Sequence, residues 1–233
     1  MTESVLVTGA NKGLGLCLVE AFLATDARVF AGFRAPAPAL DELAARNPGR
    51  VTLLALDVTD AAQVRSAADA VREQSAGLDI LINNAAILPE AGRGPLASLN
   101  VELGRELFDT NALGPLRVTQ AFLPLLRAGQ RKLVVNVSSE AGSIADCSRT
   151  QEHLYCMTKA ALNMQSAILR NDLGREGFEI LAVHPGWMRT EMGGPSAHIH
   201  PREAAEGIVA LTRRRRSADE PFYVDYRGEA LRF

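Results

Sequence analysis

The sequence has few cysteines, almost no net charge and no long uninterrupted hydrophobic run. Its three cysteines, Cys17, Cys147 and Cys156, are odd in number and irregularly spaced, which argues against a disulfide framework or zinc site and favours a reducing cytoplasm. The 25 basic and 27 acidic residues leave a net charge of −2, so no global field predicts nucleic acid or a membrane surface as a partner. No segment reaches the ~20 apolar residues of a membrane span, and the N-terminus carries no basic, hydrophobic leader. We therefore expect a soluble, cytoplasmic protein whose selectivity resides in a local site.

Short apolar runs alternate with longer amphipathic segments along the whole chain. With 233 residues and 47% hydrophobic content, residues 1–233 predict a single domain with one core. Runs such as Leu133–Val137 show little alternation, as expected where helices cover both faces of a parallel sheet. We predict strands at Ser4–Thr8, Arg28–Phe33, Val51–Asp57, Asp79–Ile82, Lys132–Val137, Glu179–His184 and Phe222–Asp225. We predict helices at Gly13–Thr25, Asp60–Ser75, Val101–Leu126, His153–Arg175 and Arg202–Arg214, with loops at Ala35–Ala39, Pro89–Pro95 and Gly193–Pro201.

This order of elements predicts a single-domain Rossmann-type, doubly wound α/β fold with a seven-stranded, mostly parallel sheet. A glycine-rich loop, with glycines at 9, 13 and 15, follows the first predicted strand and opens the first predicted helix. Glycines there allow close approach of a pyrophosphate to backbone N–H groups at a helix start. The spacing differs from the G-x-G-x-x-G fingerprint, so the strand, loop and helix context supports the site, and a surface turn is the alternative.

Two cations predict which nucleotide this loop binds. Arg34 stands at the end of the second predicted strand, where an acidic residue would grip the ribose hydroxyls, and Lys12 lies inside the glycine loop. Both charges favour a 2′-phosphate, so we predict NADP(H) over NAD(H). The alternative is that both are ordinary solvated surface cations.

A tyrosine and a lysine predict carbonyl chemistry. Tyr155 and Lys159 are four positions apart, so they share one face of a predicted helix, and an ammonium near a phenol favours its ionised form. Carbonyl reduction needs a proton donor of this kind beside the carbonyl oxygen. Ser138 and Ser139 end a predicted strand at the carboxyl edge of the sheet, and the residues alone do not decide which hydroxyl holds the substrate oxygen.

The chain resembles the short-chain dehydrogenase/reductase family, and within it a carbonyl-reductase-like branch that includes sniffer and C-factor proteins. The matching motifs are Thr8-Gly9-x-x-x-Gly13-x-Gly15, Asp57-Val58, Asn83-Asn84-Ala85, Asn111, Asn136-Val137-Ser138-Ser139, Tyr155-x-x-x-Lys159 and Pro185-Gly186-x-x-x-Thr190. The resemblance implies that Ser139 is the catalytic serine, Tyr155 the proton donor or acceptor, and Lys159 a ribose ligand that also tunes Tyr155. Asn111 would hold a water that completes a proton relay.

The same resemblance implies how the cofactor is held. Asp57 and Val58 would flank adenine, Asn84 and Ala85 the adenosine ribose, and the segment from Pro185 to Thr190 the nicotinamide amide. The full set of implied cofactor contacts is Gly9, Asn11, Lys12, Gly13, Leu14, Gly15, Arg34, Asp57, Val58, Asn84, Ala85, Tyr155, Lys159, Pro185, Gly186, Met188 and Thr190. Two departures are Ala86 in place of a glycine, and a longer separation of Ser139 from Tyr155, which predicts an enlarged loop at Ala145–His153.

These features predict an NADPH-dependent reductase of a ketone or aldehyde. The rival hypothesis is a redox-sensing or signalling protein that binds NADP(H) with little turnover. His198 and His200 lack a third nearby ligand, so we predict no metal, and the run Arg213–Arg216 is better explained by a helix C-terminus than by nucleic acid. By analogy with the family, two long predicted helices would pair subunits in a homodimer or homotetramer.

Overall fold

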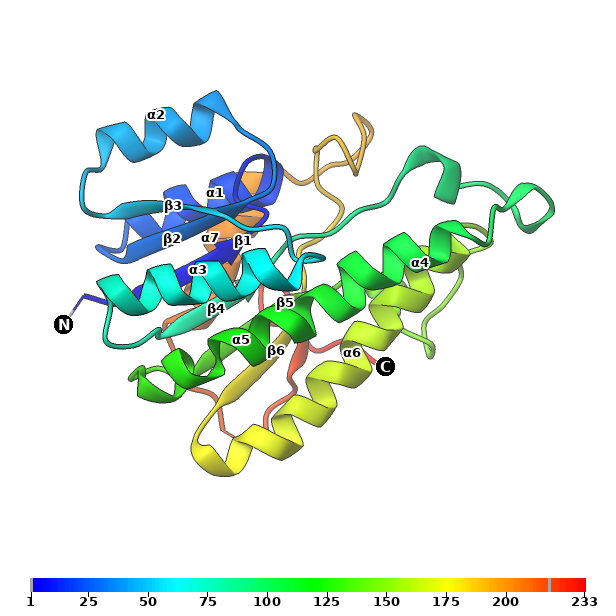
Figure 1. Cartoon of the computed structure of the whole chain (residues 1–233). Coiled ribbons are helices and arrows are strands. Elements are labelled where there is room, and N and C mark those ends of the chain that lie inside the picture. The colour runs from blue at the N-terminus through cyan, green and yellow to red at the C-terminus, as the bar shows by residue number, and fades with distance from the viewer. Residues whose placement is uncertain (1, 218) are drawn as a thin grey trace.

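A seven-stranded sheet forms the centre of the computed structural model, which describes residues 2–217 and 219–233 (Figure 1). The strand order is β3-β2-β1-β4-β5-β6-β7, and every pairing between these strands is parallel. The strands are β1 (Ser4–Thr8), β2 (Arg28–Phe33), β3 (Val51–Ala55), β4 (Ile80–Asn83), β5 (Leu133–Val137), β6 (Glu179–His184) and β7 (Tyr223–Asp225). Because the order reverses between β1 and β4, the carboxyl ends of these strands border the crevice where doubly wound sheets bind ligands.

Helices cover both faces of the sheet (Figure 1). They are α1 (Gly13–Leu23), α2 (Pro38–Arg46), α3 (Ala61–Gln74), α4 (Leu103–Phe108), α5 (Gly114–Ala128), α6 (His153–Leu173) and α7 (Pro201–Thr212). One buried apolar cluster packs α1, α2 and α7 on the sheet, and a second packs α3, α5 and α6 on its other face. The continuously apolar strands therefore arise as predicted, since both of their faces lie in a core. Among the described residues, no helix has the length and apolarity needed to cross a bilayer.

The predicted doubly wound fold is confirmed, and three predicted strands, β1, β2 and β6, have the expected bounds. One helix was missed: α2 begins at Pro38, inside the stretch that the sequence predicted to be a loop. Proline is accommodated at the first position of a helix, where its missing N–H has no partner to lose. Leu40 is the fully buried side chain of α2, and Leu43 packs partly buried against the same core, so only a narrow apolar stripe marks this short helix.

The helix predicted at Val101–Leu126 is also interrupted. Between α4 and α5 lies a π-helical turn, Asp109–Leu113, in which Asn111 is buried. At the junction, a Cβ added to Gly114 would lie 2.8 Å from a methyl group of Val58, so glycine permits the loop after β3 to pack here. A π turn adds a residue without ending the helix, which places Asn111 against the neighbouring β4 loop.

Candidate active site

The glycine-rich loop leaves the carboxyl end of β1 and enters α1. Gly9 and Gly13 have positive φ values of 64° and 53°, a region that suits glycine. A Cβ on Gly15 would lie 2.0 Å from the Gly9 carbonyl oxygen, so this turn also requires its third glycine. No side chain caps the start of α1, which leaves its first backbone N–H groups available to an anion. The loop therefore fits the pyrophosphate of a dinucleotide.

Asn84 holds this loop from the end of β4. Its side-chain amide donates to the carbonyl oxygens of Thr8 (2.8 Å) and Gly9 (3.1 Å). The Thr8 hydroxyl in turn accepts from the backbone N–H groups of Asn84 (3.0 Å) and Ala85 (3.1 Å). These contacts fix the shape of the cradle, while the predicted role of Asn84 and Ala85 beside the ribose stays a prediction.

Both cations that favour a 2′-phosphate are exposed and ion-paired. Arg34 follows β2 and lies 3.8 Å from the Asp57 carboxylate, which is partly buried. Lys12 pairs with Glu191, which belongs to the segment 191–200 after the predicted nicotinamide-binding residues. Asp57 also accepts from the backbone N–H (2.9 Å) and hydroxyl (2.7 Å) of Thr59, so its carboxylate is anchored in place.

The predicted nicotinamide-binding segment reaches the same cradle from β6. Thr190 lies against Gly13, because a Cβ on that glycine would meet a Thr190 methyl group at 3.5 Å. Gly186 has a φ of 81°, and Met188 pairs with Ile199 in a short bridge that holds segment 191–200 as a loop. Gly13, predicted to bind the pyrophosphate, and Thr190, predicted to bind the nicotinamide amide, are thus adjacent in the structure.

Tyr155 and Lys159 lie on one buried face of α6. The Lys159 ammonium nitrogen is 5.6 Å from the centre of the Tyr155 ring, and it donates to the Val137 carbonyl oxygen at 2.8 Å. Burial lowers the pKa of Lys159 to about 8. Burial also raises the pKa of Tyr155 well above its usual value, and hydrogen bonding with Ser139 only partly offsets this rise. This rise in the pKa of Tyr155 is opposite to the fall that the Lys159 ammonium alone would cause, because desolvation of the buried phenol outweighs the nearby positive charge.

The two serines at the end of β5 face different partners. The Ser138 hydroxyl donates to the Asn163 side chain on α6 at 2.6 Å, inside the core. The Ser139 hydroxyl lies instead toward Tyr155. The backbone carbonyl oxygen of Ser139 accepts a 2.7 Å hydrogen bond from the Tyr223 hydroxyl of β7. The geometry therefore brings Ser139, and not Ser138, to the phenol.

Gly142 allows the turn that carries Ser139 to approach α6. A Cβ at this position would lie 2.8 Å from the Lys159 backbone and 2.7 Å from the Asn163 amide. The sequence did not single out Tyr223, whose only signal was its place near the start of the last predicted strand, Phe222–Asp225.

Asn111 is buried in the π turn and contacts α6 through Thr158. Its side-chain oxygen accepts from the Ile87 N–H at 2.8 Å, and its amide donates to the Ile87 carbonyl oxygen (2.9 Å) and the Thr158 hydroxyl (3.2 Å). These bonds tie the π turn to the loop after β4 and to α6. The side-chain groups of Asn111 are thus already engaged, and its role in holding a water stays a prediction.

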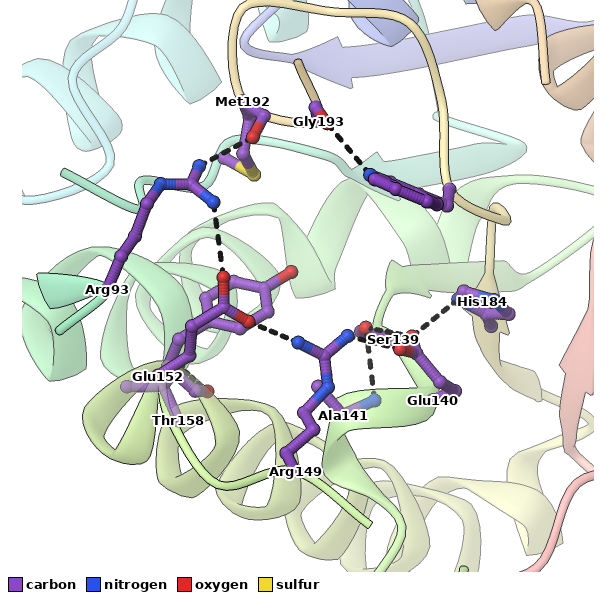
Figure 2. Close-up of polar contacts among 12 residues, drawn as sticks. Arg93, Ser139, Glu140, Ala141, Arg149, Glu152, Thr158, His184, Met192 and Gly193 are labelled. Atoms are coloured by element: carbon purple, nitrogen blue, oxygen red, sulfur yellow. Dashed lines mark hydrogen bonds and ion pairs between the residues drawn. The ribbon is translucent and has the colours of Figure 1, made fainter. Parts of the chain in front are cut away.

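A chain of alternating charges passes beside Ser139, as Figure 2 shows, and three of its members, Glu140, Arg149 and Glu152, act on the pKa of Tyr155. Arg93 contacts Glu152 at 3.1 Å, Glu152 and Glu140 both pair with Arg149, and Glu140 lies 3.4 Å from His184. Arg93 also donates to the Met192 carbonyl oxygen at 2.5 Å, which links the predicted loop Pro89–Pro95 to segment 191–200. The sequence gave no sign of this chain of ion pairs, since Arg93, the segment 140–152 and His184 lie far apart along the chain.

A cavity of about 350 Å³ opens beside this chain of charges. Its lining includes Glu140, His184, Trp187 and His198, and the Trp187 ring packs edge-on against His198 at 5.0 Å. Among the described residues, no three His, Cys, Asp or Glu side chains gather as metal ligands. His200, the second of the paired histidines, instead caps α7 by accepting from the Arg202 N–H at 3.2 Å.

The parallel sheet, the glycine cradle at its carboxyl edge and the buried serine, tyrosine and lysine define a Rossmann-type, nicotinamide-dependent oxidoreductase. The family model described as short chain dehydrogenase matches residues 3–199. The chain belongs to this short chain dehydrogenase family.

Three known proteins illustrate the similarity. The C-signal protein of Myxococcus xanthus is 38% identical over 152 residues, which span 65% of this chain and 90% of that protein. An NADPH-bound carbonyl reductase from chicken fatty liver superposes with a TM-score of 0.90 at 32% identity, covering 100% of this chain and 99% of the other. The carbonyl reductase Sniffer of D. melanogaster gives a TM-score of 0.93 at 28% identity and full coverage of both chains. The similarity to a carbonyl-reductase-like branch is thereby confirmed.

Proposed function

We propose that this oxidoreductase is an NADP(H)-dependent carbonyl reductase that reduces a ketone or an aldehyde. The observation that carries the proposal is the convergence of the Ser139 and Tyr155 hydroxyl groups beside the buried Lys159 ammonium. Two hydroxyl groups at one point suit a carbonyl oxygen, which accepts two hydrogen bonds as negative charge develops on it. The NADPH-bound carbonyl reductase among the structural relatives supports the same proposed activity.

Each side chain has a distinct role in this proposal. Tyr155 donates its phenolic proton to the carbonyl oxygen, and Ser139 holds that oxygen in place. Lys159 binds the cofactor ribose and stabilises the phenolate that remains, while Asn111 holds a water that returns a proton. The reduced cofactor, when bound, supplies the hydride for the carbonyl carbon.

The rival is a protein that binds NADP(H) to sense or signal with little turnover. The intact serine, tyrosine and lysine cluster favours the enzyme. NADPH oxidation measured against a panel of ketones and aldehydes separates the two. Tyr155-dependent turnover supports the reductase, whereas NADPH binding without turnover on any carbonyl supports the sensor.

NADPH is expected to be used in preference to NADH, with Arg34 as the main determinant. Replacing Arg34 by alanine removes the cation at the end of β2 and should lower kcat/KM for NADPH about ten- to hundredfold, the value of one charge-assisted hydrogen bond. The kcat/KM for NADH should change little. Arg46→Ala is the matched control, because Arg46 is exposed on α2 and, among residues 2–217 and 219–233, forms an ion pair only with Glu42 of its own helix. Equal losses with both cofactors would contradict the assignment.

We also propose that the protein is a cytoplasmic homodimer or homotetramer. Cys17, Cys147 and Cys156 are all free thiols, which suits a reducing compartment. Large apolar side chains stand exposed on the π turn, α5 and α6, which lie side by side in Figure 1: Leu113, Leu116, Met157, Met164 and Ile168. Such a patch typically marks a protein interface. Light scattering at micromolar concentration is expected to give a dimer or a tetramer mass, and a monomer mass would contradict this proposal.

A further inference from the structure

An ion pair joins the glycine-rich loop to the segment that follows the predicted nicotinamide-binding residues. The Lys12 ammonium donates to the Glu191 carboxylate, and among residues 2–217 and 219–233 this is the only ion pair of either side chain. The two residues are 179 positions apart in the chain. Lys12 directly precedes α1 and its side chain is 67% exposed, while that of Glu191 is 78% exposed. Both charged groups are therefore within reach of a molecule that binds at the loop.

The backbone at Glu191 is held against this loop. The Gly194 N–H donates to the Thr190 carbonyl oxygen at 2.9 Å, and the Gly193 N–H donates to the Thr190 hydroxyl at 3.1 Å. These two hydrogen bonds close a turn around Glu191. A Cβ on Gly13 would lie 3.5 Å from a Thr190 methyl group, so the turn packs on the glycine-rich loop. The Glu191 carboxylate is consequently kept near Lys12, and it can leave the ammonium by rotating into solvent without movement of the turn.

Glu191 and a cofactor phosphate would use the same cation. NADP(H) differs from NAD(H) by a 2′-phosphate, for which Lys12 and Arg34 are the predicted partners. A phosphate monoester carries a charge of about −1.5 to −2 at pH 7. The hydrogen bond from Lys12 holds the pKa of Glu191 below its usual value, so this carboxylate is also charged. A second anion must displace the carboxylate from the ammonium or share the cation against like-charge repulsion, and each course lowers the affinity for the 2′-phosphate.

Arg34, the other predicted phosphate partner, is not engaged in the same way. Its guanidinium lies 3.8 Å from the Asp57 carboxylate, a separation too long for a hydrogen bond, and Asp57 accepts instead from Thr59. Asp57 therefore takes no N–H group of Arg34, whereas Glu191 takes one of the three N–H groups of Lys12. The difference agrees with Arg34 as the main determinant of the cofactor preference and gives Glu191 an opposing effect.

We propose that Glu191 is a specificity residue for the cofactor, which competes with the 2′-phosphate of NADP(H) for the Lys12 ammonium and so limits the affinity for NADP(H). This rests on the NADP(H) preference of the proposed function. NAD(H) lacks the 2′-phosphate and has no need to displace Glu191, so the carboxylate reduces the margin between the two cofactors. The oxidised and reduced forms carry the same 2′-phosphate, so both are affected equally and the equilibrium of the reaction is unchanged.

The test measures the binding of two nucleotides that lack nicotinamide, so that turnover plays no part. Adenosine 2′,5′-bisphosphate and adenosine 5′-phosphate differ only in the 2′-phosphate, and calorimetric titration gives both dissociation constants. Glu191→Gln keeps the size of the side chain and removes its charge. At low ionic strength we expect it to lower the dissociation constant of the bisphosphate about two- to fivefold, the usual strength of an exposed ion pair, and to leave that of the monophosphate unchanged. The gain should shrink at high ionic strength, because the charges are exposed.

A second substitution shows whether the effect passes through Lys12. Lys12→Gln should raise the dissociation constant of the bisphosphate severalfold. In this background Glu191→Gln should change that constant by less than about twofold, since the cation for which the two anions compete is gone. Glu102→Gln is the matched control, because Glu102 is exposed and, in the part of the chain that the structure describes, forms an ion pair only with Arg105. It should leave both dissociation constants unchanged.

The outcomes separate this competition from the proposed function. If the wild type bound the bisphosphate more tightly than the monophosphate, but Glu191→Gln left the binding of the bisphosphate unchanged or weakened it, the competition would be refuted and the NADP(H) preference would stand. An equal gain for both nucleotides would also refute the competition, because the effect would then not involve the 2′-phosphate. If neither protein discriminated between the nucleotides, the NADP(H) preference itself would fail, and the competition with it.

Discussion

Replacing Tyr155 by phenylalanine is expected to lower kcat for carbonyl reduction by about 10²- to 10⁴-fold, the usual contribution of a positioned proton donor. The change removes one hydroxyl group and leaves a ring that fills the same buried space on α6. NADPH should still bind with an affinity within a fewfold of the wild type, because the phosphate cradle lies at the end of β1. Steady-state NADPH oxidation gives kcat, and fluorescence titration of NADPH gives the dissociation constant.

Tyr226→Phe serves as the matched control for that experiment. The Tyr226 hydroxyl donates to Glu203 on α7 at 2.7 Å, so the substitution removes an equal group from a partly buried contact that does not involve Tyr155, Ser139 or Lys159. Its kcat should stay within twofold of the wild type. If Tyr155→Phe also kept its full rate, the proton would have to come from another group, and the assignment of Tyr155 would be wrong.

The fold was predictable because most of the strands, β1, β2, β4, β5 and β6, are buried on both faces. The apolar runs that became β1, β2 and β6 are bounded by turns and have the length of strands, so their limits follow from composition alone. The helix α2 was missed because it is only nine residues long and begins at Pro38, within a proline-bearing stretch that is typical of a loop. The π turn at Asp109–Leu113 escaped because one additional residue in a helical turn hardly changes the apolar period.

The placement of Tyr155 beside Lys159 was predictable from local geometry. Tyr155 and Lys159 are separated by one helical turn, so local geometry alone places them on one face. The choice between Ser138 and Ser139 depended instead on which side of β5 meets Asn163 and which meets Tyr155, a tertiary property. Family resemblance favours Ser139, which is the serine that lies toward Tyr155, and its catalytic role stays a prediction.

The charges around the site were beyond sequence reasoning. Arg93 and Glu152 are 59 positions apart, and Arg149 reaches Glu140 across a turn whose path no local pattern encodes. Exposed charges are common in any sequence, and pairing becomes visible only when the loops are placed. The sequence also could not predict the raised pKa of Tyr155, because burial is its main cause and burial depends on the tertiary structure.

Lys159→Met is expected to remove most turnover while making the folded protein more stable at pH 7. Burial holds the pKa of Lys159 at about 8, against 10.5 for an exposed lysine, which corresponds to a cost of about 3 kcal/mol for keeping the ammonium in the core. Methionine fills similar space without a charge. The Val137 carbonyl oxygen loses its donor, which costs about 1 kcal/mol, so a net gain of about 2 kcal/mol in the free energy of unfolding is expected. The loss of turnover should be on the order of a hundredfold, since the phenolate and the ribose both lose their cation.

The pH dependence of that gain gives the sharper test. Between about pH 8 and pH 10.5, Lys159 loses its proton in the folded protein but keeps it in the unfolded chain. The unfolded state then binds more protons, so the stability contribution of this site rises with pH in the wild type. The advantage of Lys159→Met should therefore be largest at pH 7 and decline steadily toward pH 10.5. Urea unfolding of both proteins across this range measures the difference. If the difference in the free energy of unfolding between the two proteins stayed constant with pH, Lys159 would not be a buried ammonium. The protein would then hold no destabilising cation beside Tyr155.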